Sequence, residues 1–239
     1  MAEFISNETL KKDIKRHLDY MEKNNIDIIS IEDREYPSIL KEIYNPPINL
    51  YIRGSKKILD APALAIVGCR DATDYGKKVA YDFAYNLSKE GYNIVSGLAR
   101  GIDSFSHLGA IEAKRKTMAV LGNGIDTIYP KENEKLAQSI LDSNGAIISE
   151  YPLGTKPDKN NFPTRNRIIS GISNGVLVIE AKEKSGTLIT VDFALEQGRD
   201  VYAIPGNIDS KNSFGTNDLI KQGARLVTNW EELIWDRHE

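Results

Sequence analysis

Short apolar runs alternate with amphipathic segments from about residue 61 onward. The runs that predict strands cover residues 63–68, 92–97, 117–122, 146–150, 175–180, 200–206 and 224–228. The segments between them predict helices near residues 75–90, 104–115, 133–143, 164–173, 187–198 and 216–222. Strands that are apolar on both faces and joined by helices indicate a parallel sheet covered on both sides. We therefore expect an α/β fold over residues 61–228, with a doubly wound, mostly parallel, Rossmann-like sheet.

The first 60 residues follow a different pattern. A polar, helix-like segment runs to about residue 24, and prolines punctuate the connector between two short predicted strands at 26–31 and 50–54. This stretch is too small for a strong core of its own. We expect a small N-terminal α/β extension over residues 1–60 that packs onto the sheet, and a C-terminal tail over residues 229–239.

The composition is that of a globular protein, with 41% hydrophobic and 27% charged residues. No apolar run approaches the roughly 20 residues that span a bilayer. The N-terminus is polar and lacks the apolar stretch of a signal peptide, so we expect a cytoplasmic protein without membrane contact. A single cysteine, Cys69, excludes an intrachain disulfide and a multi-cysteine metal site.

The net charge of −3 does not advertise a nucleic-acid binder. It leaves room for a local basic pocket on an acidic body, because net charge alone does not decide which partners a protein has.

The distinctive residues gather after the predicted strands, where open α/β sheets bind their ligands. These segments are GCRDATDYG (68–76), SGLARGID (96–103), GNGID (122–126), YPKEN (129–133), 149–167, EAKEKSGTLIT (180–190) and PGNIDS (205–210). Glycines let a backbone approach a ligand, and free amides at helix N-termini bind anions. The same glycines could equally serve tight turns. The pattern predicts a pocket for a phosphate-bearing ligand.

The segment 150–166 is the strongest local anomaly, because long connections without structure are usually functional or mobile. It carries Lys156, Lys159, Phe162 and Arg165, and Arg167 follows inside the next predicted helix. Helical residues two apart point about 200° apart, so Arg165 and Arg167 cannot both face one ligand if both are helical. One of them could serve the loop and the other a salt bridge.

Ser185, Gly186 and Thr187 stand at the predicted start of a helix. Ser185 or Thr187 could be an N-cap, and the same three residues could cradle a phosphate. The two interpretations are compatible.

Candidate catalytic groups lack partners in the sequence. His107 is as consistent with a buried structural histidine as with a reactive one, and no motif supplies Cys69 with a base. Asp103, Asp126 and Glu180 could bind a ribose or a metal, or cap backbone amides. Dinucleotide, P-loop and Ser-His-Asp signatures are absent. We expect no enzymatic activity, no cofactor and no metal.

Five segments in one order resemble the DprA/Smf family of DNA-processing proteins. They are VGCRDATDYG, SGLARGIDSFSHLGA, FPTRNRIISGISNGVLVIEA, SGTLITVDFALEQGRDVYAIPG and GTNDLIKQGA. The resemblance covers roughly residues 27–228, and the spacing of its FPxRNR and SGxLIT motifs makes it specific.

The resemblance implies a Rossmann-like domain that binds and protects single-stranded DNA and delivers it to the recombinase RecA in natural transformation. It implies a non-enzymatic homodimer, with residues 200–226 as the expected dimer face. The residues that it places at the DNA pocket are Gly68, Cys69, Arg70, Lys159, Phe162, Arg165, Asn166, Arg167, Ser185, Gly186 and Thr187.

The chain departs from the family in three respects. Cys69 stands where the family usually has serine, and we expect a shortened N-terminal helical region and no winged-helix domain. Two alternatives stay open. One is a phosphoribohydrolase-like enzyme, although its PGGxGTxxE pattern is absent and Asp192 lies five residues after Thr187. The other is a sensor of a free nucleotide.

Overall fold

The computed structural model describes residues 8–234 and places nine strands in one sheet, in the order β1-β2-β6-β5-β4-β3-β7-β8-β9. The strands are β1 Ile26–Ser30, β2 Asn49–Gly54, β3 Ala63–Val67, β4 Asn93–Ser96, β5 Thr117–Leu121, β6 Ala146–Ser149, β7 Gly175–Val178, β8 Asp200–Ala203 and β9 Arg225–Leu226. Every pair from β6 through β9 is parallel. The prediction of a mostly parallel α/β sheet is confirmed.

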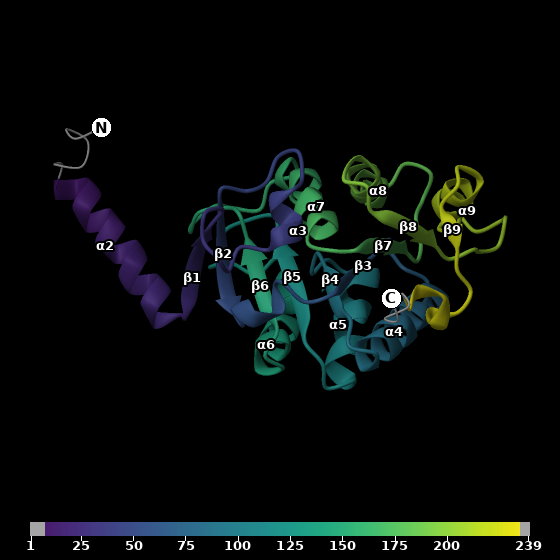
Figure 1. The fold of residues 1–239 in the computed structure, drawn as a ribbon, viewed down its shortest axis with the longest axis horizontal. Helices are drawn as coiled ribbons and strands as arrows, with labels where there is room; N and C mark the ends of the chain where they lie inside the picture. The colour runs from purple at the N-terminus through teal and green to yellow at the C-terminus, as the bar shows by residue number, and fades with distance from the viewer. Residues whose placement is uncertain (1–7, 235–239) are drawn as a thin grey trace.

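Helices cover both faces of the sheet (Figure 1). One face carries α3 Ser38–Lys41, α7 Asn161–Gly171, α8 Gly186–Glu196 and α9 Phe214–Lys221. The other carries α4 Asp74–Lys89, α5 Ile102–Glu112 and α6 Glu134–Asp142. Every residue of β3, β5 and β7 is consequently buried, which explains why these strands are apolar except for Thr117 at the start of β5. Within residues 8–234, we find no helix with both the length and the apolar character to cross a bilayer.

The N-terminal segment contributes to the same sheet. Helix α2, Glu8–Lys23, projects from the body and leads into β1. Strand β2 pairs antiparallel with both β1 and β6. The sheet is therefore continuous across residue 60, and the expected domain limits stay a prediction. Residues 1–7 of the expected first helix and 235–239 of the expected tail lie outside the described residues.

The path of the chain creates a switch point beside β3. From β3 the chain builds β4, β5 and β6 in one direction, then returns through α7 to place β7 on the other side of β3. The connections that follow β3 and β7 therefore leave their neighbouring carboxyl ends in opposite directions. Open α/β sheets bind ligands at this kind of position.

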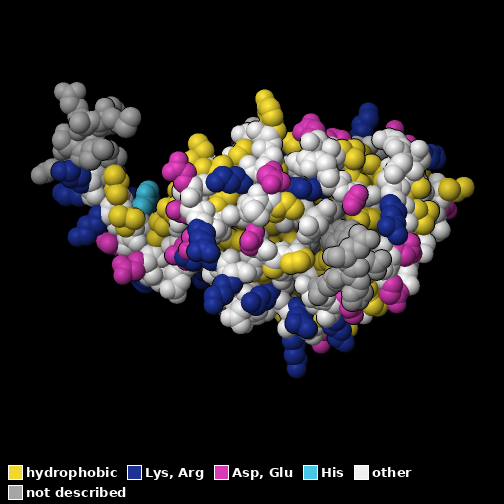
Figure 2. Space-filling model, viewed as in Figure 1, with side chains coloured by type: hydrophobic (Ala, Val, Ile, Leu, Met, Phe, Trp, Pro, Cys, Tyr) yellow, Lys and Arg dark blue, Asp and Glu magenta, His cyan; other side chains and the backbone are white. Residues whose placement is uncertain are grey.

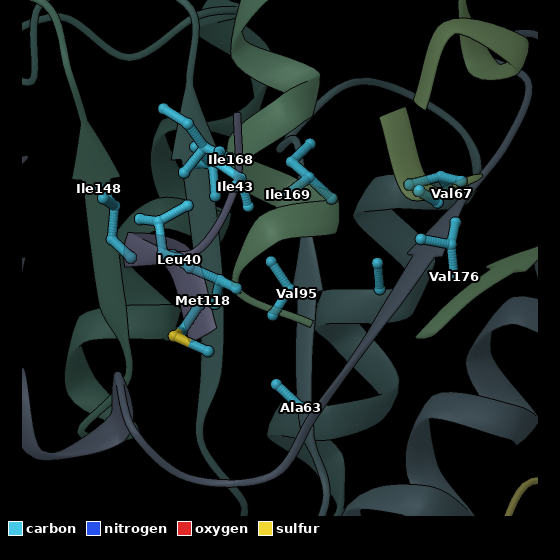
Figure 3. Packing of buried hydrophobic residues seen from close by; sticks show 14 of the residues in the cluster. Leu40, Ile43, Ala63, Val67, Val95, Met118, Ile148, Ile168, Ile169 and Val176 are labelled. Carbon is cyan, nitrogen blue, oxygen red and sulfur yellow. The ribbon is translucent and has the colours of Figure 1, made fainter. Parts of the chain in front are cut away.

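Helix α7 begins earlier than the sequence predicts. Its first residue is Asn161, so the preceding loop ends at residue 160 rather than 166. Pro163 falls in the first turn, where the missing proline N–H is not needed for an intrahelical bond. Further along the helix, Ile168 packs beside Leu40 and Ile43 in the largest buried cluster (Figure 3). This packing fixes the height of α7 above the sheet.

Arg167 ties three segments together behind α7. Its two terminal nitrogens donate to the two carboxylate oxygens of Glu150 over 2.7 and 2.6 Å, and its Nε donates to the carbonyl oxygen of Asn45 over 3.0 Å. The side chains of this ion pair are only 8% and 15% exposed. A buried bidentate pair of this kind is strongly destabilising to break, because the surviving charge is left without a partner.

We expect Arg167→Met to lower the free energy of unfolding by about 3–5 kcal/mol, because Glu150 would lose its buried counter-charge. Urea unfolding followed by circular dichroism measures this change. Arg100→Met is the matched control, because Arg100 pairs with Glu132 on the exposed surface and should leave the midpoint nearly unchanged. Equal midpoints for both variants would contradict the structural role of Arg167.

Candidate functional site

A cleft of about 660 Å³ opens at the carboxyl ends of the central strands. The segments that follow β3, β4, β5 and β7 line it from below, and the end of the 150–160 loop and the start of α7 line it from above. Ten of the eleven predicted site residues lie on this lining: Gly68, Cys69, Arg70, Lys159, Phe162, Arg165, Asn166, Ser185, Gly186 and Thr187. The sequence prediction therefore converges on one cavity.

Arg167 is the predicted site residue that does not line the cleft. Its guanidinium points to Glu150 and Asn45, on the side of α7 away from Arg165. Because α7 starts at Asn161, both arginines lie on the same helix. Residues two apart on a helix point about 200° apart, so the two side chains must point in different directions. A role for Arg167 in ligand binding stays a prediction, and its observed contacts are structural.

Arg165 lies in the floor of the cleft and is 4% exposed. Its Nη1 donates to the carbonyl oxygens of Gly97, over 3.0 Å, and Val120. Glycine at position 97 leaves space for this guanidinium, because a Cβ would come within 2.5 Å of Nη2 of Arg165. Arg165 thus provides hydrogen bonds for carbonyl oxygens at the ends of β4 and β5, and it adds positive charge to the floor of the cleft.

Asp103 lies beside Arg165 at the start of α5. Its carboxylate accepts from the backbone N–H groups of Gly97, over 3.1 Å, and Ala99, over 3.2 Å. Burial raises the pKa of Asp103, and the nearby Arg165 guanidinium opposes that rise. Burial also lowers the pKa of Arg165, to about 10, so the guanidinium keeps its proton at neutral pH.

The cleft carries unpaired positive charge. Arg70, Lys159 and Lys184 are exposed and form no ion pair with any carboxylate among residues 8–234. Lys182 also lines the cleft, 3.4 Å from the carboxylate of Asp71. With Arg165, five cationic side chains line the cleft, and the carboxylates on the lining are Asp71 and Asp103. The cleft therefore has a local charge of +3, although the net charge of the whole chain is −3. On the face shown in Figure 2, acidic and basic side chains are interspersed.

Aromatic rings form the wall of the cleft on the β5 side. The guanidinium carbon of Arg70 lies 5.5 Å from the ring centroid of Phe162. The ring centroids of Tyr129 and Phe162 are also 5.5 Å apart, and the planes of these two rings are inclined by 32°. Gly122 makes room for this wall, because a Cβ there would come within 2.8 Å of the Phe162 ring. Site prediction missed Tyr129, although the YPKEN segment that contains it follows β5.

The N-terminus of α8 closes the cleft on the β7 side. Ser185 is the N-cap, and its hydroxyl oxygen accepts from the Thr187 N–H over 3.2 Å. Asn166 joins α7 to this turn by donating to the Gly186 carbonyl oxygen over 3.3 Å. Gly186 is exposed, and no atom of residues 8–234 lies within 4 Å of where its Cβ would stand. The exposed first residue of α8 therefore lines the cleft, at the helix end that favours anions.

Gly68 and Cys69 hold the β3 end in place. A Cβ on Gly68 would come within 2.6 Å of Ile102, so glycine lets α5 pack against this strand. The Cys69 N–H donates to the Glu180 carbonyl oxygen over 2.9 Å. Burial raises the pKa of the Cys69 thiol, which opposes thiolate formation at neutral pH.

The remaining candidate groups have structural partners. The Glu180 carboxylate accepts from the Thr73 N–H over 3.0 Å at the start of α4, and Asp126 accepts from the Gly154 N–H over 3.0 Å. His107 is fully buried, with Nδ1 2.8 Å from Oγ1 of Thr117. Burial lowers the pKa of His107 to about 3, so the imidazole is neutral. The contacts observed for these three residues are structural ones.

The chain is similar to known proteins in both sequence and structure. The chain is 44% identical over 224 residues to Protein Smf of Escherichia coli K12, a match that covers 94% of this chain and 60% of that protein's length. The structure of DNA processing protein A from Streptococcus pneumoniae superposes with a TM-score of 0.83 at 41% identity, over 90% of this chain and 76% of that one.

A second solved structure is that of DNA processing protein A from Helicobacter pylori, described for its single-stranded DNA binding mode. It superposes with a TM-score of 0.79 at 32% identity, over 87% of this chain and 93% of that one. The family described as DNA recombination-mediator protein A matches residues 27–238. The resemblance inferred from the motifs is confirmed, and the chain belongs to the DprA/Smf family of DNA recombination-mediator proteins.

Proposed function

We propose that the cleft binds single-stranded DNA and that the chain is a recombination mediator that protects the strand and passes it to the recombinase RecA. The observation that carries this proposal is the convergence of three unpaired cations and an aromatic wall on one cavity. The Helicobacter pylori relative, 32% identical, binds single-stranded DNA. Natural transformation in the cytoplasm is the setting that we propose for this activity.

The chemistry of the cleft suits a single strand better than a duplex. Phosphates are bound by Arg, Lys and helix N-terminal amides, and bases stack on aromatic faces. Bases in a duplex are already paired and stacked, so they cannot reach rings set inside a concavity. Arg70 and Lys159 would contact the backbone, and Phe162 would contact a base.

The phosphoribohydrolase-like alternative has less support. The cleft carboxylates among the described residues are Asp71, beside Lys182, and Asp103, which accepts from two backbone amides. Asp192 is exposed on α8 and does not line the cleft. We therefore propose a binding protein rather than an enzyme. A free-nucleotide sensor is distinguished by competition, because saturating AMP would displace all bound DNA from such a site.

The assembly that we propose is a homodimer formed through the β8–β9 edge of the sheet. A groove of about 410 Å³ lies there between α8 and α9, within the expected dimer face of residues 200–226 and the adjoining end of α8. Leu195 and Leu226 are 62% and 44% exposed beside it. Apolar side chains at the open edge of a sheet favour association with a second copy.

We expect Arg70→Ala and Lys159→Ala each to weaken binding of an oligothymidine and to flatten its salt dependence, because fewer counterions are released. Phe162→Ala should weaken binding without changing the salt slope. Fluorescence anisotropy at two salt concentrations, against a matched duplex and with excess AMP, measures all three effects. Lys116→Ala is the control, since this exposed lysine precedes β5 at the opposite end of the sheet.

Wild-type affinity in all three cleft variants would show that the strand binds elsewhere. Complete displacement of the oligonucleotide by AMP would favour the nucleotide sensor.

Gly186→Ala tests whether a phosphate approaches the start of α8. The added methyl meets no atom within 4 Å, so the fold should tolerate it and the thermal midpoint should not fall. The same methyl would stand at the exposed amino end of the helix, where a phosphate would approach, and should weaken oligonucleotide binding several-fold. Unchanged affinity in a normally folded variant would remove α8 from the binding site.

Leu195→Glu should shift the protein from dimer to monomer in size-exclusion chromatography with light scattering, because it places a charge in the proposed interface. Tyr44→Glu, at a fully exposed tyrosine outside the groove, is the control. A Leu195→Glu protein that elutes like the wild type would refute this dimer face.

A further inference from the structure

We infer that Tyr129 is a second base-binding ring, at the β5 end of the cleft, and that the bound strand crosses the central strands from Tyr129 toward the start of α8. This inference rests on the proposed binding of single-stranded DNA. It adds a contact residue, and it gives the ligand a direction and a minimum length.

Of the two rings in the aromatic wall, Tyr129 is the more exposed. Phe162 is half-buried, with Arg70 over its ring and Gly122 against its edge. Tyr129 lies on the cleft lining, stacks at an angle on Phe162, and keeps 45% of its surface exposed. A large ring left this exposed in a cleft lined by five cations offers a face that a base can cover.

Tyr129 lies between two segments that side-chain hydrogen bonds hold in place. Before it, Asn123 donates to the Thr127 carbonyl oxygen over 2.7 Å. After it, the 3₁₀ turn Lys131–Asn133 is fixed by Asn133, which donates to the Leu98 carbonyl oxygen over 2.8 Å. A ring on a braced backbone loses little further conformational entropy when a ligand covers it.

Tyr129 and the start of α8 lie at opposite ends of the cleft. Tyr129 follows β5, whereas Ser185 and Gly186 follow β7, and the sheet places β4 and β3 between these strands. Three strand spacings amount to about 14 Å across the sheet. A base on Tyr129 and a phosphate at α8 therefore belong to different nucleotides. Arg70, after β3, lies between them and can contact the connecting backbone.

The cleft thus divides into two subsites with different chemistry. The β5 subsite takes a base through Tyr129 and Phe162, and the β7 subsite takes a phosphate through Lys184 and the Gly186 amide. A mononucleotide can fill one subsite at a time. Affinity should consequently rise steeply from thymidine monophosphate to the shortest oligothymidine that reaches both subsites.

The test compares Tyr129→Ala, Tyr129→Phe and the control Tyr44→Ala. Each is titrated with an oligothymidine and with an abasic oligonucleotide of equal length. For the oligothymidine, Tyr129→Ala should weaken binding by about 5-fold to 150-fold, the range expected for one lost base stack. Tyr129→Phe should retain wild-type affinity, because the ring remains. For the abasic strand, all three variants should match the wild type, and the salt slope should not change.

Two results would overturn the inference while leaving the proposed function intact. One is a Tyr129→Ala protein that binds oligothymidine like the wild type. The other is an equal loss of affinity for the abasic strand, which would assign Tyr129 to packing alone. If the wild-type protein binds no single-stranded DNA, the proposed function and this inference both fail. Thermal unfolding of each variant separates loss of contact from loss of fold.

Discussion

The crossing of α7 over the sheet is the constraint on which the rest of this structure depends. The helix must carry the chain from β6, past three other strands, to β7. Two buried arginines on opposite sides of α7 donate hydrogen bonds to backbone carbonyl oxygens. Arg165 donates to Gly97 and Val120, and Arg167 donates to Asn45. A guanidinium suits this task because its fixed fork of donors serves several acceptors at once. With α7 held in this way, its first turn forms the roof of the cleft.

The same constraint divides the basic residues into two groups. Arg165 and Arg167 are buried and satisfy backbone oxygens or Glu150. Arg70, Lys159 and Lys184 are exposed and have no carboxylate partner among the described residues, so their charge is available to a ligand. An acidic chain can in this way hold a locally positive cavity. Charge is decisive here by its placement, because interactions across more than about 10 Å of solvent are largely screened at moderate salt.

Several glycines that suggest ligand approach in the sequence serve internal packing instead. Gly97 leaves space for the Arg165 guanidinium, Gly122 for the Phe162 ring and Gly68 for Ile102. Gly186 differs, because no described residue comes within 4 Å of the position that its Cβ would take. Sequence alone cannot separate these cases, since the atoms that would collide with each Cβ come from distant segments. The contrast makes Gly186 the glycine whose exchange reports on a ligand.

The sequence by itself determined the fold class, the approximate places of the strands and the cleft, and ten of the residues that line it. It could do so because burial on both faces of a parallel sheet imposes uninterrupted apolar runs, and because ligand sites in such sheets follow the strand ends. Only the tertiary structure decided that α7 starts at Asn161, that Arg167 turns away to Glu150, and that Tyr129 joins the aromatic wall. These outcomes depend on contacts between residues far apart in the chain, and local sequence patterns carry no information about such distances.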